Sequence, residues 1–184
     1  MRYIFLLSLL IMAYTYDRKA AVKYAYKYYK TINHKCGTGR WKCTPYGYFG
    51  NKQCDYPADK NGDSANFVSQ CLLAGGHKDL KGGQCRGMPC GKEETDPFRL
   101  AVCLHETFKH KKKCGKNLEP PSWVKPGDVL VYHKDSCEGR DSSVALVTVA
   151  GANAKVTSHT PEVKDKSYTH MANTKPFYEW IHIK

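Results

Sequence analysis

The stretch Asn61-Gly-Asp-Ser-Ala-Asn-Phe-Val-Ser-Gln-Cys-Leu-Leu-Ala-Gly-Gly76 joins a polar loop, an apolar run and a pair of glycines. Glycine just past the last turn is typical of a helix C-terminus, so the pattern predicts a helix from about Ser64 to Ala74. The N-terminus of a helix gathers unpaired N–H groups and favours negative charge. A thiol at the position of Ser64 would have a lowered pKa, whereas a serine hydroxyl needs an adjacent base to become a nucleophile.

Two more helices are expected on either side of this stretch. Residues 16–30 place Asp17 where it can cap a helix, and an apolar stripe follows at helical spacing: Ala21, Tyr24, Ala25 and Tyr28. We expect this stripe to pack in the core. Residues 95–98 read Thr-Asp-Pro-Phe and open a third helix, with proline at its first position. Residues 33–62 are rich in Gly, Pro, Asn and Cys, which predicts a disulfide-tied loop.

The last third of the chain is rich in β-prone residues. The expected strands are Asp128–Tyr132, Val144–Val149, Lys155–Ser158 and Phe177–Ile183. Helices first and strands later indicate an α+β fold, with N-terminal helices packed on a C-terminal antiparallel sheet. The chain has 184 residues and shows no internal repeat or linker, so residues 16–184 are expected to form a single domain.

The N-terminus and the cysteines indicate a secreted protein. Residues 1–15 combine a basic Arg2 with a short apolar run, which predicts a signal peptide rather than a transmembrane helix. Nine cysteines in such a chain predict disulfides formed in an oxidising compartment. The odd count leaves one thiol over, and Cys71 is the best candidate because it lies within an apolar helical run. Which of the other cysteines pair with one another stays open.

The formal net charge is +12. A basic secreted domain is expected to associate with anionic surfaces such as acidic polysaccharide, phospholipid or nucleic acid. The simpler alternative is that the positive charge only keeps the surface solvated. Nothing in the sequence predicts a specific nucleic-acid partner or an oligomer, so we expect a monomer.

Four segments carry recognisable motifs in a fixed order. Residues 62–76 contain Gly-Asp-Ser-Ala-Asn-Phe-Val-Ser-Gln and Ala-Gly-Gly, and residues 16–25 read Tyr-Asp-Arg-Lys-Ala-Ala-Val-Lys-Tyr-Ala. Residues 126–132 read Pro-Gly-Asp-Val-Leu-Val-Tyr, and residues 158–160 read Ser-His-Thr. Together they resemble the putative amidase domain family, a branch of the papain-like cell-wall peptidases and amidases. The resemblance implies a papain-like fold and amide hydrolysis by a cysteine nucleophile with a histidine base.

The chain departs from this family at both positions that would carry the reaction. The family's cysteine falls on Ser64 and its histidine on Ser143, while His159 remains in what corresponds to the orienting or third position. Removing members of a nucleophile–base unit typically costs several orders of magnitude in rate. We therefore expect a catalytically degenerate domain that binds a peptide, a peptidoglycan-like polymer or an anionic glycan without cutting it.

Two other functions stay open. The chain could be an amidase or peptidase with Ser64 as nucleophile and His133 or His159 as base. It could also be a toxin-like or structural coat protein, in which the disulfides provide durability.

The candidate binding residues are Asp63, Asn66, Gln70, Trp123 and His133. Asp63 and Asn66 could equally cap the helix and fix the loop, and Gln70 could be structural. The spacing of Asp63, His133 and His159 has no metal signature, so neither a metal nor another cofactor is expected.

Overall fold

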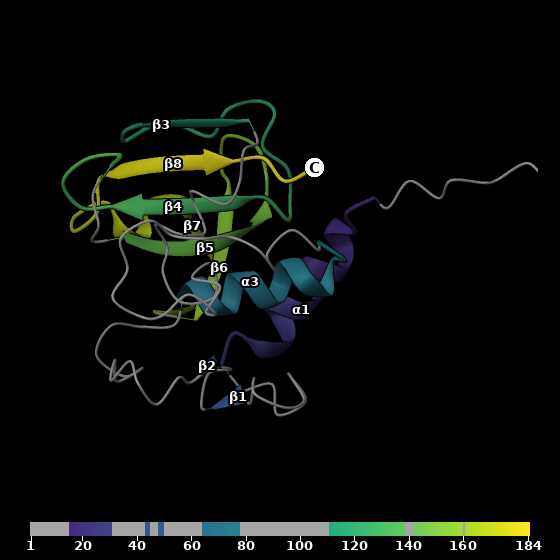
Figure 1. The fold of residues 1–184 in the computed structure, drawn as a ribbon. Coiled ribbons are helices and arrows are strands. Elements are labelled where there is room, and N and C mark those ends of the chain that lie inside the picture. The colour runs from purple at the N-terminus through teal and green to yellow at the C-terminus, as the bar shows by residue number, and fades with distance from the viewer. Residues whose placement is uncertain are drawn as a thin grey trace, which may run out of the picture.

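The computed structural model describes residues 15–30, 43–44, 48–49, 64–77, 111–138, 142–159 and 161–184. In these parts two α-helices, α1 and α3, pack on one face of a six-stranded antiparallel sheet, as Figure 1 shows. The expected α+β fold, with helices first and the sheet second, is confirmed. The expected signal peptide and the expected third helix lie outside the described residues.

Helix α1 (Arg18–Tyr28) begins at Asp17, whose carboxylate accepts a hydrogen bond from the backbone N–H of Ala20 at 3.0 Å. Ala21 and Ala25 are fully buried, and partly buried tyrosines flank them. Small residues let the helix approach its neighbours closely, while the tyrosine rings cover the rim of the contact. The predicted cap and the predicted core stripe are therefore both confirmed.

Helix α3 (Ser64–Ala74) runs through the core between α1 and the sheet. It ends at Gly75 and Gly76, and Gly76 has a left-handed φ of +85°. A Cβ atom on Gly75 would lie 2.4 Å from the ring of Tyr16, so only glycine fits there. The Asp17 N–H also donates to the Gly75 carbonyl at 2.8 Å. The glycine pair thus ends α3 and contacts the residues that begin α1.

The sheet has the strand order β3-β8-β4-β5-β6-β7. Its four central strands are β4 (Val129–His133), β5 (Ser142–Val149), β6 (Lys155–His159) and β8 (Phe177–Ile181), close to the expected bounds. The two edge strands, β3 (Lys112–Lys116) and β7 (Glu162–Ser167), were not expected. Both are largely charged and exposed, which is usual for sheet edges because charge blocks pairing with another chain.

Three short elements complete the described structure. Strands β1 (Cys43–Thr44) and β2 (Tyr48–Phe49) pair as a two-stranded sheet inside the region expected to be an irregular loop. A 3₁₀ helix, η4 (Tyr168–Met171), follows β7, and Ser167 caps it. No described helix has the length and apolar character required to cross a bilayer.

Each face of the sheet carries its own apolar cluster. The cluster beneath α1 and α3 includes Val129, Val131, Val144, Leu146, Ile181 and Ile183. The cluster on the other face includes Leu130, Tyr132, Ala145, Val147, Tyr178 and Trp180. Successive side chains on a strand point to opposite faces. Sequence parity along β4, β5 and β8 therefore tells which side chains face the helices.

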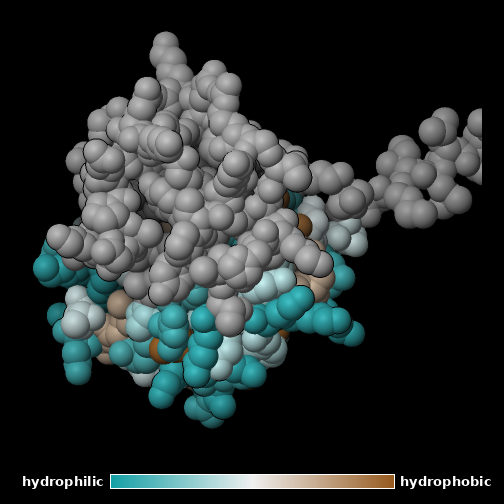
Figure 2. Space-filling view, turned by 90° about the horizontal axis from the view of Figure 1, so that it is seen from below, coloured by the Kyte–Doolittle hydropathy of each residue, from teal (hydrophilic) through white to brown (hydrophobic). Residues whose placement is uncertain are grey.

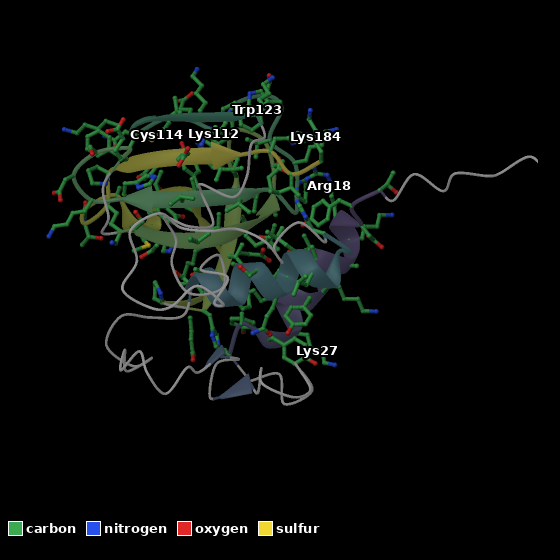
Figure 3. All side chains as sticks on the ribbon, viewed as in Figure 1. Arg18, Lys27, Lys112, Cys114, Trp123 and Lys184 are labelled. Atoms are coloured by element: carbon green, nitrogen blue, oxygen red, sulfur yellow. A yellow bond between two sulfur atoms is a disulfide. The ribbon has the colours of Figure 1, made fainter. Side chains whose placement is uncertain are left out.

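Asp128 ties α1 to the sheet. Its carboxylate is fully buried and accepts hydrogen bonds from Arg18 at 2.6 Å, His182 at 3.0 Å and the Ile183 N–H at 3.0 Å. Arg18 also donates to the Ile183 carbonyl, and Figure 3 shows it near the C-terminal Lys184. A buried carboxylate needs such partners because burial removes its hydration. The Gly-Asp motif at residues 127–128 thus has a structural role here.

The described cysteines include one disulfide and one free thiol. Cys114 on β3 forms a disulfide with Cys137, which follows β4. Cys71 is the predicted free thiol and is completely buried in α3. Burial raises the pKa of this thiol well above its usual value, which keeps it protonated. A buried, protonated thiol of this kind is a poor nucleophile.

Candidate functional site

Ser64 lies at the N-terminus of α3, as the sequence predicts, and packs against the start of β5. It is 8% exposed, and its Oγ accepts a hydrogen bond from the backbone N–H of Val144 at 3.2 Å. Among the described residues, no imidazole nitrogen hydrogen-bonds to this oxygen. The Ser64 hydroxyl satisfies a buried backbone donor, and no side-chain base of the described residues hydrogen-bonds to it.

The side chain of Ser143 points to the face of the sheet that lies away from the helices. It pairs with Tyr132 across β5 and β4, and Tyr132 belongs to the cluster on the face away from the helices. Alternation along β5 therefore directs Ser143 away from α3, while Ser142 and Val144 face the helices. Of the two adjacent serines, Ser142 shares a face with the start of α3.

A second constellation lies on the helix-facing side of the same strands. His133 Nδ1 is 2.8 Å from Ser142 Oγ, and His133 Nε2 is 3.2 Å from Glu179 Oε2. The three residues lie on β5, β4 and β8, which are neighbours in the sheet. His133 and Glu179 are almost fully buried, whereas Ser142 is half-buried. A hydroxyl, an imidazole and a carboxylate thus line up across three strands.

Lys112, on the edge strand β3, lies beside the carboxylate of Glu179. Its Nζ is 4.0 Å from the second carboxylate oxygen of Glu179, and its side chain is 39% exposed. Figure 3 shows Lys112 and Cys114 on β3 beside β8. A positive charge beside a buried carboxylate favours the ionised form.

Sequence reasoning singled out His133 but missed Ser142 and Glu179. One signal was available for Glu179, since an acidic residue inside the apolar segment Phe177–Ile181 requires a buried partner. Ser142 could not be told from Ser143, because only the register of β4 against β5 places it opposite His133.

The remaining candidate residues lie in varied settings. His159 is the last residue of β6, is 4% exposed, and stacks on Phe67 of α3 with the ring centroids 5.4 Å apart. Gln70 is buried between the helices and accepts a hydrogen bond from the Tyr24 hydroxyl. Asp63 and the side chain of Asn66 lie outside the described residues.

Trp123 lies away from the start of α3. Its ring makes an edge contact with His182 and carries the Lys111 ammonium 5.2 Å from its centroid. It packs against the cluster on the outer face of the sheet, and Figure 3 shows it near β3. The structure thus separates Trp123 from Ser64, Gln70 and His133. In the described ranges, no three His, Cys, Asp or Glu side chains gather as metal ligands would.

The described fold is an α+β domain in which a buried helix begins beside serine and histidine side chains of an antiparallel sheet. The chain belongs to the putative amidase domain family, whose model matches residues 15–181. No curated protein matches the chain, and no solved structure matches it.

Proposed function

We propose that this chain is an amidase-family domain in which the reaction of the inherited cysteine and histidine positions is lost, and that it acts as a secreted binding module. Its ligand would be a peptide, a peptidoglycan-like polymer or an anionic glycan. The observation that carries the proposal is the hydrogen bond from the Val144 N–H to the Ser64 hydroxyl.

That contact bears directly on reactivity. A serine hydroxyl attacks an amide only when a base within hydrogen-bonding reach removes its proton. The backbone N–H of Val144 is a donor, so it lowers the electron density on Ser64 Oγ and removes no proton. The alternative in which Ser64 is the nucleophile therefore lacks its second component among the described residues.

A groove beside α1 has lysines among its lining residues, and its walls are almost wholly apolar, so the carbon chains of these lysines rather than their ammonium groups form its inner surface. The groove has a volume of about 540 Å³, and the residues that line it are Arg18, Lys19, Val22, Lys23, Tyr26, Lys125 and Pro126. Lys19, Lys23 and Lys125 are exposed. The Arg18 guanidinium is held by Asp128, so the ammonium groups of the three lysines are the charges around this groove that an anion could meet.

Other lysines on and near α1 lie over aromatic rings, one of which, Tyr26, also lines the groove. The Lys164 ammonium is 4.8 Å from the centroid of the Tyr26 ring, and Lys27 lies 5.0 Å from that of Tyr28. Figure 2 shows a mostly hydrophilic surface over the described residues of its view. Cationic and aromatic side chains together suit a sugar polymer that bears carboxylate or sulfate groups.

The papain-like relationship and the secretion are part of the proposal. The order of the four motifs supports the first, and the apolar leader supports the second. The Cys114–Cys137 disulfide also supports an oxidising compartment, because such bonds persist there.

A sedimentation assay tests the binding. Purified protein is incubated at low salt with insoluble peptidoglycan, with chitin and with beads that carry a sulfated glycan, and is then centrifuged. We expect retention on at least one polymer, and complete recovery in every supernatant would contradict the proposal.

Two double variants test whether binding depends on the groove or only on the total positive charge of the protein. Lys19→Gln with Lys23→Gln should weaken retention on the sulfated beads. Lys116→Gln with Lys155→Gln removes the same charge from exposed sites outside the groove and should weaken it less. Equal losses would show that net charge alone drives binding.

A further inference from the structure

Ser142, His133 and Glu179 stand in the spatial order of a nucleophile, a base and an acid. The two distances, 2.8 Å from Ser142 Oγ to His133 Nδ1 and 3.2 Å from His133 Nε2 to Glu179 Oε2, both fall within hydrogen-bonding reach. Such units are recognised by geometry and roles rather than by sequence position. The family resemblance assigns none of these roles to Ser142 or Glu179.

The carboxylate decides where the imidazole proton lies. An ionised carboxylate accepts hydrogen bonds and donates none. With Glu179 ionised, His133 Nε2 donates to the carboxylate, and in the neutral imidazole Nδ1 then presents its lone pair to Ser142. The Lys112 ammonium lies 4.0 Å from the other carboxylate oxygen of Glu179, so the carboxylate has a cationic neighbour on its far side. This is the tautomer that a general base for Ser142 requires.

The surroundings of Ser142 also suit a reaction. Ser142 is half-buried at the first position of β5, whereas His133 is almost fully buried, so the imidazole is largely shielded from water. Val144 lies two residues further along the same face, about 6.6 Å away at the usual rise of a strand. The start of α3 contacts Val144 through Ser64. The start of α3 therefore lies on the same side of β5 as Ser142.

We propose that Ser142, His133 and Glu179 form a catalytic unit that transfers acyl groups from carboxylic esters or amides to water. Ser142 Oγ attacks the carbonyl carbon while its proton passes to His133 Nδ1. The C–O or C–N bond of the substrate then breaks, and the leaving group takes that proton. Water next attacks the acyl-serine, passes one proton through His133 to Ser142 Oγ, and releases the carboxylic acid.

This inference goes beyond the binding function. The inherited reaction at Ser64 and Ser143 stays lost, because Ser142 is neither of the two inherited catalytic positions. Glu179 makes no contact with the substrate in this scheme, so it is a positioning residue that acts through His133.

A fluorophosphonate probe tests the inference. The oxygen of an activated serine forms a bond to the phosphorus of the probe, and fluoride leaves. The base takes the proton of the serine hydroxyl. We expect the full-length mature protein to gain one adduct on the peptide that contains Ser142. Ser142→Ala should lower the labelling rate at least about 100-fold, whereas Ser64→Ala should leave it nearly unchanged. An adduct that persists in Ser142→Ala overturns the proposal, as does an absence of labelling in folded protein.

A thiol at the same position gives a second readout. Ser142→Cys places a sulfur beside the imidazole, which favours the thiolate, so iodoacetamide should alkylate it faster than a cysteine in the unfolded chain. An equal or slower rate overturns the proposal. Thermal melting checks that each variant folds. The sedimentation assay then separates the two proposals, since Ser142→Ala should bind polymers like the unmodified protein.

Discussion

Ser64 and Ser142 are two serines near the start of β5, and they differ in what their hydroxyl groups contact. Ser64 Oγ accepts a hydrogen bond from a backbone N–H, whereas Ser142 Oγ lies against an imidazole that is backed by a carboxylate. The family's motif points to the first position, and the side-chain chemistry points to the second. The comparison teaches that the neighbours of a hydroxyl, rather than its place in a motif, decide whether it can react.

The largest expected effect is on the base. His133→Gln keeps a polar side chain on β4 but removes the proton acceptor for Ser142. General-base catalysis typically contributes about 10²–10⁴-fold, so we expect the rate of fluorophosphonate labelling to fall within that range. The time course of intact-mass spectra measures it. A rate close to that of the unmodified protein would break the distinction between the two serines.

A smaller loss of labelling is expected from the positioning residue. Glu179→Gln retains the shape of the side chain but can no longer fix the protonated nitrogen of His133 as an anion. We expect the labelling rate to fall by about tenfold or more, yet by less than in His133→Gln. Near-UV circular dichroism should remain unchanged. An unaltered rate in a folded Glu179→Gln protein would remove Glu179 from the unit.

We expect the alanine variant of Ser64 to lose more stability than that of Ser142, the reverse of their expected effects on labelling. Ser64→Ala leaves the buried Val144 N–H without its acceptor, which costs about 1–3 kcal/mol in the free energy of unfolding. Ser142 is half-buried, so Ser142→Ala should cost less than about 1 kcal/mol because water can replace its hydroxyl. Urea unfolding of the two variants at one pH measures the difference. A larger loss in Ser142→Ala would contradict the assigned roles.

The smallest expected effect is on the pH dependence of stability. Burial raises the pKa values of Cys71 and Tyr16, so the folded state keeps their protons at a pH where the unfolded chain releases them. The free energy of unfolding should therefore decline as the pH rises above about 9, where an exposed thiol ionises. Roughly half a pH unit above that point, the contribution of Cys71 is under about 1 kcal/mol. Cys71→Ala should flatten the slope, measured by urea unfolding from about pH 8 to about pH 10.

The sequence was sufficient for the elements that carry a strong local pattern. Asp17, the alanines of α1 and the glycines after α3 indicated both helices, and runs of Val, Leu and Ile indicated the four central strands. The edge strands β3 and β7 were missed because their residues are mostly charged, so their place in the sheet depends on a neighbouring strand rather than on their own composition.

The candidate site was predictable only in part, for a related reason. Ser64 could be placed because its position follows from a local loop-to-helix transition. The contact between His133 and Ser142 depends on the register of two strands, and Glu179 joins them from a third strand much later in the chain. Pairings of this kind follow from the whole sheet rather than from any single segment.

The Cys114–Cys137 disulfide links this chemistry to the redox state of the surroundings. Cys137 lies in the connection between His133 and Ser142, and Cys114 lies on the strand that carries Lys112. With a sequence separation of 23 residues, the bond restricts the unfolded chain by an amount worth about 3 kcal/mol. Reduction of this bond would therefore lower the free energy of unfolding of the domain, so the arrangement of His133 and Ser142 would be less stable in a reducing medium than in an oxidising one.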